Sequence, residues 1–161
     1  MTLIVEDGTG LADADSYISL ADARLYAANY GFELPDDDAQ AEIALRQGTG
    51  YIDLQEPCFI GERLTATQNL AYPRDDDSGM PAALGRAAVA AAAEYGAGTD
   101  VRSTDDGKSV ASEKVTGAVE VSYFQNGKTG ESVVITKAMD LLRPLMISCG
   151  NNGYSFQVER A

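Results

Sequence analysis

Residues 81–96 read PAALGRAAVAAAAEYG, and this alanine-rich stretch decides the fold. Pro81 suits the first position of a helix, because its fixed φ is already helical and its missing N–H would have no partner there. Gly96 marks the end of the helix. Because small side chains let another helix approach closely, we predict that this is the central helix. Its predicted inner face consists of Leu84, Ala87, Ala88, Ala91, Ala92 and Tyr95.

Capping signals and apolar spacing predict three more helices, over residues 20–30, from 38 to about 54, and over 136–142. Ser19 followed three residues later by an aspartate resembles a capping box, and Gly31 stops the first helix. Three aspartates open the second helix, where the helix dipole favours negative charge. A proline closes the last one.

Two glycines interrupt the predicted helix over residues 38–54. Gly48 and Gly50 each weaken it by about 1 kcal/mol relative to alanine. Either another segment approaches the backbone closely at these positions, or the helix simply tolerates the glycines. The sequence leaves both interpretations open.

The remaining segments complete a mainly α fold, a small bundle of about four helices with an inserted β-hairpin and extended terminal arms. Val115 to Tyr123 alternates apolar and polar residues, Asn126-Gly127 is a turn signal, and Val133-Val134-Ile135 can return as a second strand. The segment up to Gly10 reads as an extended arm that ends in a turn. We therefore predict a single domain over residues 1–161. It comprises an N-terminal arm (1–18), a helical core (19–97), a β-hairpin (108–136), a last helix (137–147) and a C-terminal tail (148–161).

The chain is strongly acidic. It carries 25 Asp and Glu against 12 Lys and Arg, for a net charge of −13 and an isoelectric point near 4.2. Residues 1–80 hold 16 acidic and 4 basic side chains, whereas residues 81–161 hold 9 and 8. The acids either solvate the surface or form a face that keeps DNA from adhering. Such a balance opposes generic nucleic-acid binding.

No motif for catalysis, cofactor binding or metal binding stands out, and we predict no enzyme, cofactor or metal. The sequence has no histidine, so the commonest general base is absent. Gly8-Thr9-Gly10 is not followed by the Gly-Lys-Ser/Thr of a phosphate-binding loop. Carboxylate pairs are numerous, and nothing in the sequence singles one out for glycoside hydrolysis.

Two windows of the sequence partly match the pattern of a calcium-binding loop. In the window that starts at Arg102, Asp106, Gly107 and Glu113 fall at loop positions five, six and twelve, yet the arginine stands where the first ligand is required. The stretch from Asp75 to Gly79 lacks the distal glutamate. Both windows are interpreted as solvated turns.

The cysteines and the N-terminus favour residence in a reducing cytoplasm. Cys58 and Cys149 have no CxxC spacing, and structural thiols are the simplest interpretation. The apolar run at residues 3–5 is too short for a signal peptide, and no stretch approaches membrane-spanning length. We therefore expect no contact with a membrane.

The basic and aromatic residues give only a weak indication of nucleic-acid binding. Proteins that bind single strands interleave aromatic residues with Lys and Arg, and this sequence does not. Along the chain, Tyr26, Tyr30, Phe32, Tyr51 and Tyr72 stand among acidic or apolar residues, which favours a role in the core. Arg63, Arg74 and Arg86 are assigned to local ion pairs or capping. The only candidate DNA-binding face combines Lys108, Lys114, Lys128, Lys137 and Arg143.

An ordered set of segments resembles a known family. The segments are Leu3 to Gly10, Ala14 to Ser19, Gln68-Asn69-Leu70-Ala71-Tyr72-Pro73-Arg74, the helix opened by Pro81, and Val110 to Tyr123. In this order they resemble phage proteins labelled DnaT-like single-stranded-DNA-binding proteins, which are similar in turn to the head-to-tail connectors, or adaptors, of tailed bacteriophages. The match spans about residues 3–146.

The resemblance implies a structural adaptor subunit in the neck of a virion, assembled in the bacterial host cytoplasm. Its implied partners are the portal protein, other neck and tail proteins, and further copies of itself in a ring of about a dozen. Phage DNA would pass through the ring without specific binding. The alternative, which the family label suggests, is a single-stranded-DNA-binding replication accessory protein.

Overall fold

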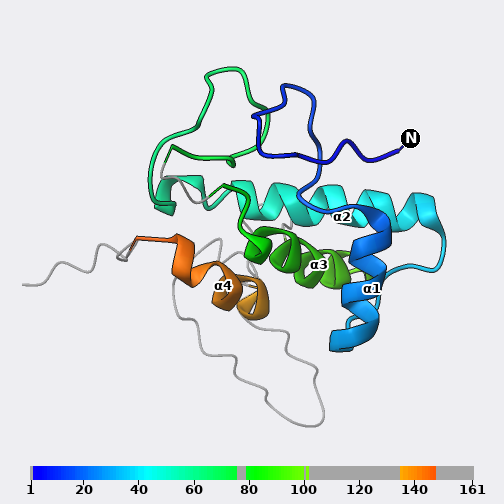
Figure 1. Cartoon of the computed structure of the whole chain (residues 1–161). Coiled ribbons are helices and arrows are strands. Elements are labelled where there is room, and N and C mark those ends of the chain that lie inside the picture. The colour runs from blue at the N-terminus through cyan, green and yellow to red at the C-terminus, as the bar shows by residue number, and fades with distance from the viewer. Residues whose placement is uncertain (1, 76–78, 100, 102–134, 148–161) are drawn as a thin grey trace, which may run out of the picture.

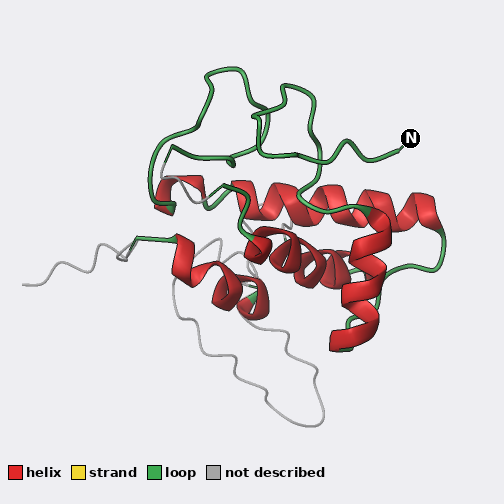
Figure 2. Cartoon of the chain, viewed as in Figure 1, coloured by secondary structure: helices red, strands yellow, loops and turns green. Residues whose placement is uncertain are grey.

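The computed structural model describes residues 2–75, 79–99, 101 and 135–147, and within these ranges the regular secondary structure is helical, with long loops before the first helix and ahead of the third (Figures 1 and 2). The helices are α1 (Leu20–Tyr30), α2 (Asp38–Asp53), α3 (Ala82–Gly96) and α4 (Thr136–Leu142), with 3-10 turns η1 (Glu56–Cys58) and η2 (Arg143–Leu145). No strand is present in these ranges. No helix among the described residues is long and apolar enough to span a bilayer.

The predicted hairpin is not supported. Nearly all of it lies outside the described residues, as does the predicted tail. Ile135, which we expected in its second strand, instead precedes α4 as the N-cap residue. The mainly helical fold class is confirmed, and the β element of the prediction is not.

The capping signals place the helix ends as expected. The Ser19 hydroxyl accepts a hydrogen bond from the backbone N–H of Asp22 at 3.1 Å, and Gly31 closes α1 in the left-handed conformation at φ 72°. Asp37 caps α2 by accepting from the backbone N–H of Gln40 at 2.9 Å. One boundary differs, because Pro81 is the N-cap of α3 rather than its first helical residue.

Helix α3 is the centre of the bundle, as its alanines predict. It packs against α1, α2 and α4, and eight of its residues between Leu84 and Ala92 are buried (Figure 1). Two apolar clusters meet along it. The larger includes Tyr51, Tyr72 and Leu142, and the smaller includes Leu3, Leu45 and Val89.

The N-terminal segment is extended, but it packs on the chain's own core instead of projecting as an arm. Leu3 is buried, and the Ile4 carbonyl accepts from the backbone N–H groups of Asp15 and Ser16 at 2.8 and 3.2 Å. Glu6 is only 4% exposed. Its carboxylate accepts hydrogen bonds of 2.9 to 3.0 Å from the backbone N–H groups of Gly8, Gly10 and Leu11.

Candidate functional site: a loop network and an aromatic–cation surface

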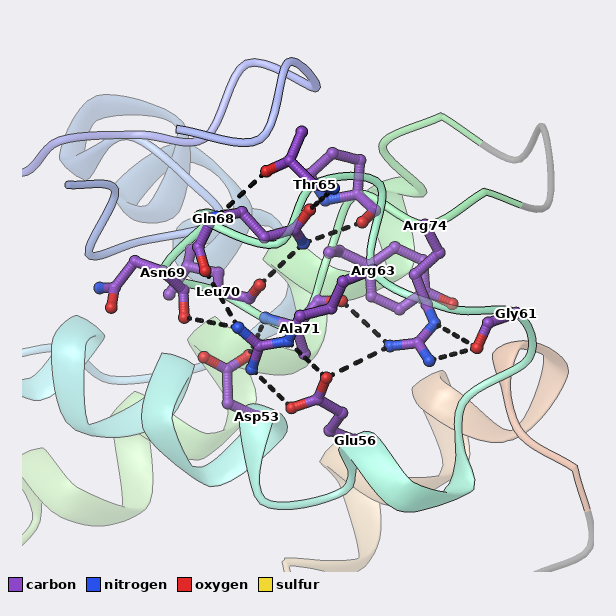
Figure 3. A network of polar contacts seen from close by, with 12 residues as sticks. Asp53, Glu56, Gly61, Arg63, Thr65, Gln68, Asn69, Leu70, Ala71 and Arg74 are labelled. Atoms are coloured by element: carbon purple, nitrogen blue, oxygen red, sulfur yellow. Dashed lines mark hydrogen bonds and ion pairs between the residues drawn. The ribbon is translucent and has the colours of Figure 1, made fainter. Parts of the chain in front are cut away.

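The segment 68–74, which carries the resemblance, lies in the long loop between η1 and α3 and is held by its own polar side chains (Figure 3). Gln68 is buried, and its side-chain amide donates to the carbonyls of Leu70 and Pro73, both at 2.9 Å. Its amide oxygen accepts from the backbone N–H of Thr65 at 2.9 Å. One side chain therefore closes the loop on itself.

Arg74 is 8% exposed and acts as a second internal clamp. Its guanidinium donates to the carbonyl of Ile60 at 2.8 Å, to that of Ala71 at 3.2 Å, and to that of Gly61. It also lies 6.0 and 5.8 Å from the ring centroids of Phe59 and Tyr72. The Arg74 guanidinium thus links the stretch at Ile60 and Gly61 to the stretch at Ala71.

Arg63 forms a bidentate pair with Glu56, with Nε–Oε1 and Nη2–Oε2 distances of 2.6 Å (Figure 3). Its remaining nitrogen, Nη1, donates to the carbonyl of Gln68 at 3.0 Å. The hydrogen bonds from Arg63 hold the pKa of the Glu56 carboxyl below its usual value. The expected role in local ion pairs or capping is confirmed for Arg63 and Arg74. Arg86, assigned the same role, forms no ion pair with a described carboxylate and lies over an aromatic ring instead.

Asp53, at the end of α2, ties the loop to the N-terminal segment. Its Oδ1 accepts from the Tyr17 hydroxyl and from the backbone N–H of Ala71 at 3.1 Å, while the Tyr17 oxygen accepts from the backbone N–H of Tyr72 at 3.2 Å. Burial raises the pKa of Asp53, and burial together with the charge of Asp53 raises the pKa of Tyr17. The Asp53 carboxylate therefore holds the Tyr17 side chain and the backbone at Ala71 in place.

A second cluster gathers aromatic rings and cations from α1, the turn after it, α3 and α4. Tyr26 lies 4.4 Å from Tyr30 and 5.9 Å from Phe32 between ring centroids. Arg86 lies 5.9 Å from the centroid of Tyr26, and the Lys137 ammonium lies 5.3 Å from that of Phe32. We call these five residues the aromatic–cation surface.

The aromatic–cation surface is accessible and borders a groove. Tyr30 is 64% exposed, and Arg86 and Lys137 are both exposed. Between α1 and the start of α3 lies an open groove of about 370 Å³, lined in part by Leu25, Tyr26, Asn29 and Arg86. This part of the molecule therefore offers rings, cations and a concave surface together.

The sequence interpretation of the aromatics was right for two residues and wrong for one. Tyr51 and Tyr72 are buried in the core, Tyr26 and Phe32 are half-buried, and Tyr30 is largely exposed. The partners of these rings, Arg86 and Lys137, stand far from them in the sequence. No local spacing could have indicated the cluster.

The candidate face of five basic residues is not assembled within the described part of the chain. Lys137 belongs to the aromatic–cation surface, and Arg143 pairs with Asp140 at 2.9 Å. The other three lysines lie outside the described residues. Two further arginines are also paired internally, Arg24 with Asp38 and Arg46 with Asp15, each at 2.6 Å.

No group of three possible metal ligands occurs among the described residues. The calcium-loop window that starts at Arg102 lies outside the described residues. In the window that starts at Asp75, the Asp75 carboxylate accepts a hydrogen bond from the backbone N–H of Glu62 at 2.7 Å. Cys58 is disulfide-bonded, which corrects the expectation of a thiol at that position.

Comparison with known proteins supports the DnaT-like part of the resemblance and does not confirm the connector part. A family model described as "Putative DnaT-like ssDNA binding protein" matches residues 1–161. No curated protein and no solved structure matches the chain. Because the family match extends over its whole length, the chain belongs to the family of DnaT-like ssDNA-binding proteins that this description names.

Proposed function

We propose that the protein binds single-stranded DNA and does so without catalysing a reaction. The observation that carries this proposal is the family match over residues 1–161, whose description names this activity. The exposed ring of Tyr30 packs on Tyr26, over which the exposed Arg86 lies, and the exposed Lys137 lies over the neighbouring Phe32. This cluster is compatible with the proposal, because single-strand binding proteins combine stacking platforms with positive charge.

The charge of the chain limits how such binding can work. Non-specific affinity draws mostly on phosphate neutralisation by Lys and Arg, and a chain with net charge −13 supplies little of it. Binding is therefore expected to be weak and to require low salt.

Titration of a fluorescein-labelled oligodeoxythymidylate with the whole chain at low salt tests the proposal. We expect saturable binding at micromolar protein, with weaker binding to duplex DNA of the same length, because paired bases cannot stack on the protein. Failure to bind the single strand under these conditions would remove the proposed activity.

The second candidate function is that of a head-to-tail connector subunit of a tailed phage. Two observations favour it, namely the acidity of the chain and the internal pairing of Arg24, Arg46, Arg63, Arg74 and Arg143. A channel lined by such a surface would let DNA slide. In this role a ring of about twelve copies would sit under the portal protein in the neck of the virion and contact other neck and tail proteins.

Cryo-electron microscopy of the neck of the corresponding virus particle distinguishes the two candidates. A ring of this chain directly below the portal would establish the connector role. Absence of the chain from purified particles would exclude that role and leave single-strand binding as the function to pursue.

A further inference from the structure

We propose that the aromatic–cation surface is where single-stranded DNA binds, with a base stacked on Tyr30 and phosphates paired by Arg86 and Lys137. This inference rests on the proposed function and names its site and its mode. It brings one exposed ring, Tyr30, and two exposed cations into one cluster of the described residues.

In the contacts of the surface, two stacked rings lie between two cations. Lys137 lies over Phe32, Phe32 stacks on Tyr26 with an interplanar angle of 22°, and Arg86 lies over Tyr26. Tyr30 packs beside Tyr26 and turns most of its own surface to solvent. A single strand offers a partner for each kind of group, because its bases can stack on rings and its phosphates can pair with cations.

The three rings differ in burial, and this difference indicates which of them can stack on a base. Tyr26 and Phe32 are half-buried and are packed by each other and by the two cations, so they serve as the floor of the site. Tyr30 is 64% exposed and retains open ring surface for a base. Tyr30 is therefore the side chain on which stacking should depend most.

The two cations are available for phosphate. Neither Arg86 nor Lys137 forms an ion pair with a described carboxylate, whereas Arg24, Arg46, Arg63, Arg74 and Arg143 all do. Among the described residues, Arg86 lies over the ring of Tyr26 and Lys137 over that of Phe32, and such contacts leave their N–H groups able to donate.

The adjoining groove offers a place for a second base. Leu25 and Asn29 line it and can accept the apolar face and the polar edge of a second base. Asp22 also lines the groove and would repel a phosphate placed beside it. The phosphates are therefore expected beside Arg86, which also lines the groove, and away from Asp22.

This geometry predicts that base stacking contributes more to the affinity for DNA than phosphate neutralisation does. For single strands the slope of log K against log salt is about −0.7 per phosphate neutralised, so two cations give a slope of about −1.4. A protein that binds chiefly through a basic groove would show a much steeper slope.

The test compares matched variants of the whole chain by fluorescence anisotropy with the labelled oligodeoxythymidylate. Tyr30→Ala should weaken binding by about 5- to 150-fold, the range for loss of one base–aromatic stack, and Tyr30→Phe should recover most of the loss. Leu54→Ala, which shortens another exposed apolar side chain, is the control. Circular dichroism verifies that each variant is folded.

Charge is tested separately with Lys137→Gln against Arg143→Gln, since both remove one positive charge close together in the sequence. Lys137→Gln should weaken binding and make the salt slope shallower by about 0.7, while Arg143→Gln should leave the slope unchanged. If the unaltered protein does not bind the single strand at all, the proposed function fails. If it binds and the Tyr30 and Lys137 variants behave like their controls, the activity stands and this site is wrong.

Discussion

Gly48 of α2 faces the backbone of Ala88 in α3 so closely that a Cβ atom at position 48 would lie 2.4 Å from the Ala88 carbonyl oxygen. The same Cβ would lie 2.9 Å from the backbone nitrogen of Ala92. The sequence left open whether each glycine of α2 permits close approach of another segment or is simply tolerated. The structure gives a different answer for each of them. Gly48 permits close approach of the central helix, and Gly50, with nothing within 4 Å of its Cβ position, is tolerated.

Gly48→Ala and Gly50→Ala should therefore have opposite effects on stability. The first should lower the free energy of unfolding by about 1–3 kcal/mol, because α2 and α3 must move apart. The second should raise it by about 0.5–1 kcal/mol, because alanine restricts the unfolded chain and favours the helix. Urea unfolding measures both, and destabilisation by Gly50→Ala would show that this position is also crowded.

Leu3 and Ile4 test whether the N-terminal segment is packed or free. Leu3 is buried in the smaller core cluster, whereas Ile4 is 41% exposed. Leu3→Ala should cost about 2 kcal/mol or more, and Ile4→Ala less than about 1 kcal/mol. Equal and small losses by urea unfolding would mean that the segment behaves as the independent arm expected from the sequence.

Arg74 should be irreplaceable even by lysine. A single ammonium group cannot reach the carbonyls of Ile60, Gly61 and Ala71 together, so Arg74→Lys should cost about 2 kcal/mol and Arg74→Ala about 3–5 kcal/mol. Arg143→Gln, at an exposed pair, should stay within about 0.5 kcal/mol. Tolerance of Arg74→Lys would show that the loop does not depend on the guanidinium fork.

Thr49 is fully buried on α2, and its hydroxyl has no hydrogen-bond partner among the described residues. Thr49→Val removes the unpaired hydroxyl and keeps the shape, so it should raise the free energy of unfolding by about 1 kcal/mol. Thr49→Ser keeps the hydroxyl and loses a methyl group, and should lower it by about 1 kcal/mol. A loss of stability in Thr49→Val would reveal a hydrogen bond at this hydroxyl.

Asp53 gives the fold a pH dependence of defined sign. Its pKa is raised in the folded state, chiefly by burial, so the folded protein holds this proton more tightly than the unfolded chain does. The charged carboxylate therefore costs stability above the folded pKa, and this cost disappears as the pH falls toward about 4, the ordinary aspartate value.

Asp53→Asn retains an oxygen that can accept from Tyr17 and Ala71 and abolishes the charge. Its urea midpoint should exceed that of the unaltered protein most at neutral pH, with the difference shrinking toward acid pH. A difference that grew on acidification would mean that the ionised carboxylate stabilises the fold.

Much of the fold was predictable because it rests on local signals. The Ser19 cap, the aspartates before α2 and the alanines of α3 act through their immediate neighbours, and they placed the helices to within about one residue. The predicted strands rested chiefly on the alternation of apolar and polar residues. Ile135, at the end of the second predicted strand, is the N-cap residue of α4. The family, too, was recognisable from ordered segments.

The candidate site was not predictable in the same way. Tyr26, Tyr30 and Phe32 are close in sequence, but the cations that complete the cluster come from α3 and α4. The sequence assigned Arg63 and Arg74 to local ion pairs or capping, but only the folded loop decided which carbonyl groups they bind.

The sequence by itself determined where the helices begin and end, that α3 is central, and that the chain is acidic. Only the tertiary structure decided which glycine of α2 admits its neighbour, that the N-terminal segment returns to the core, and which cations remain at the surface. The reason is physical, because caps and helix periodicity act over a few residues, whereas burial and charge pairing depend on segments brought together from distant parts of the chain.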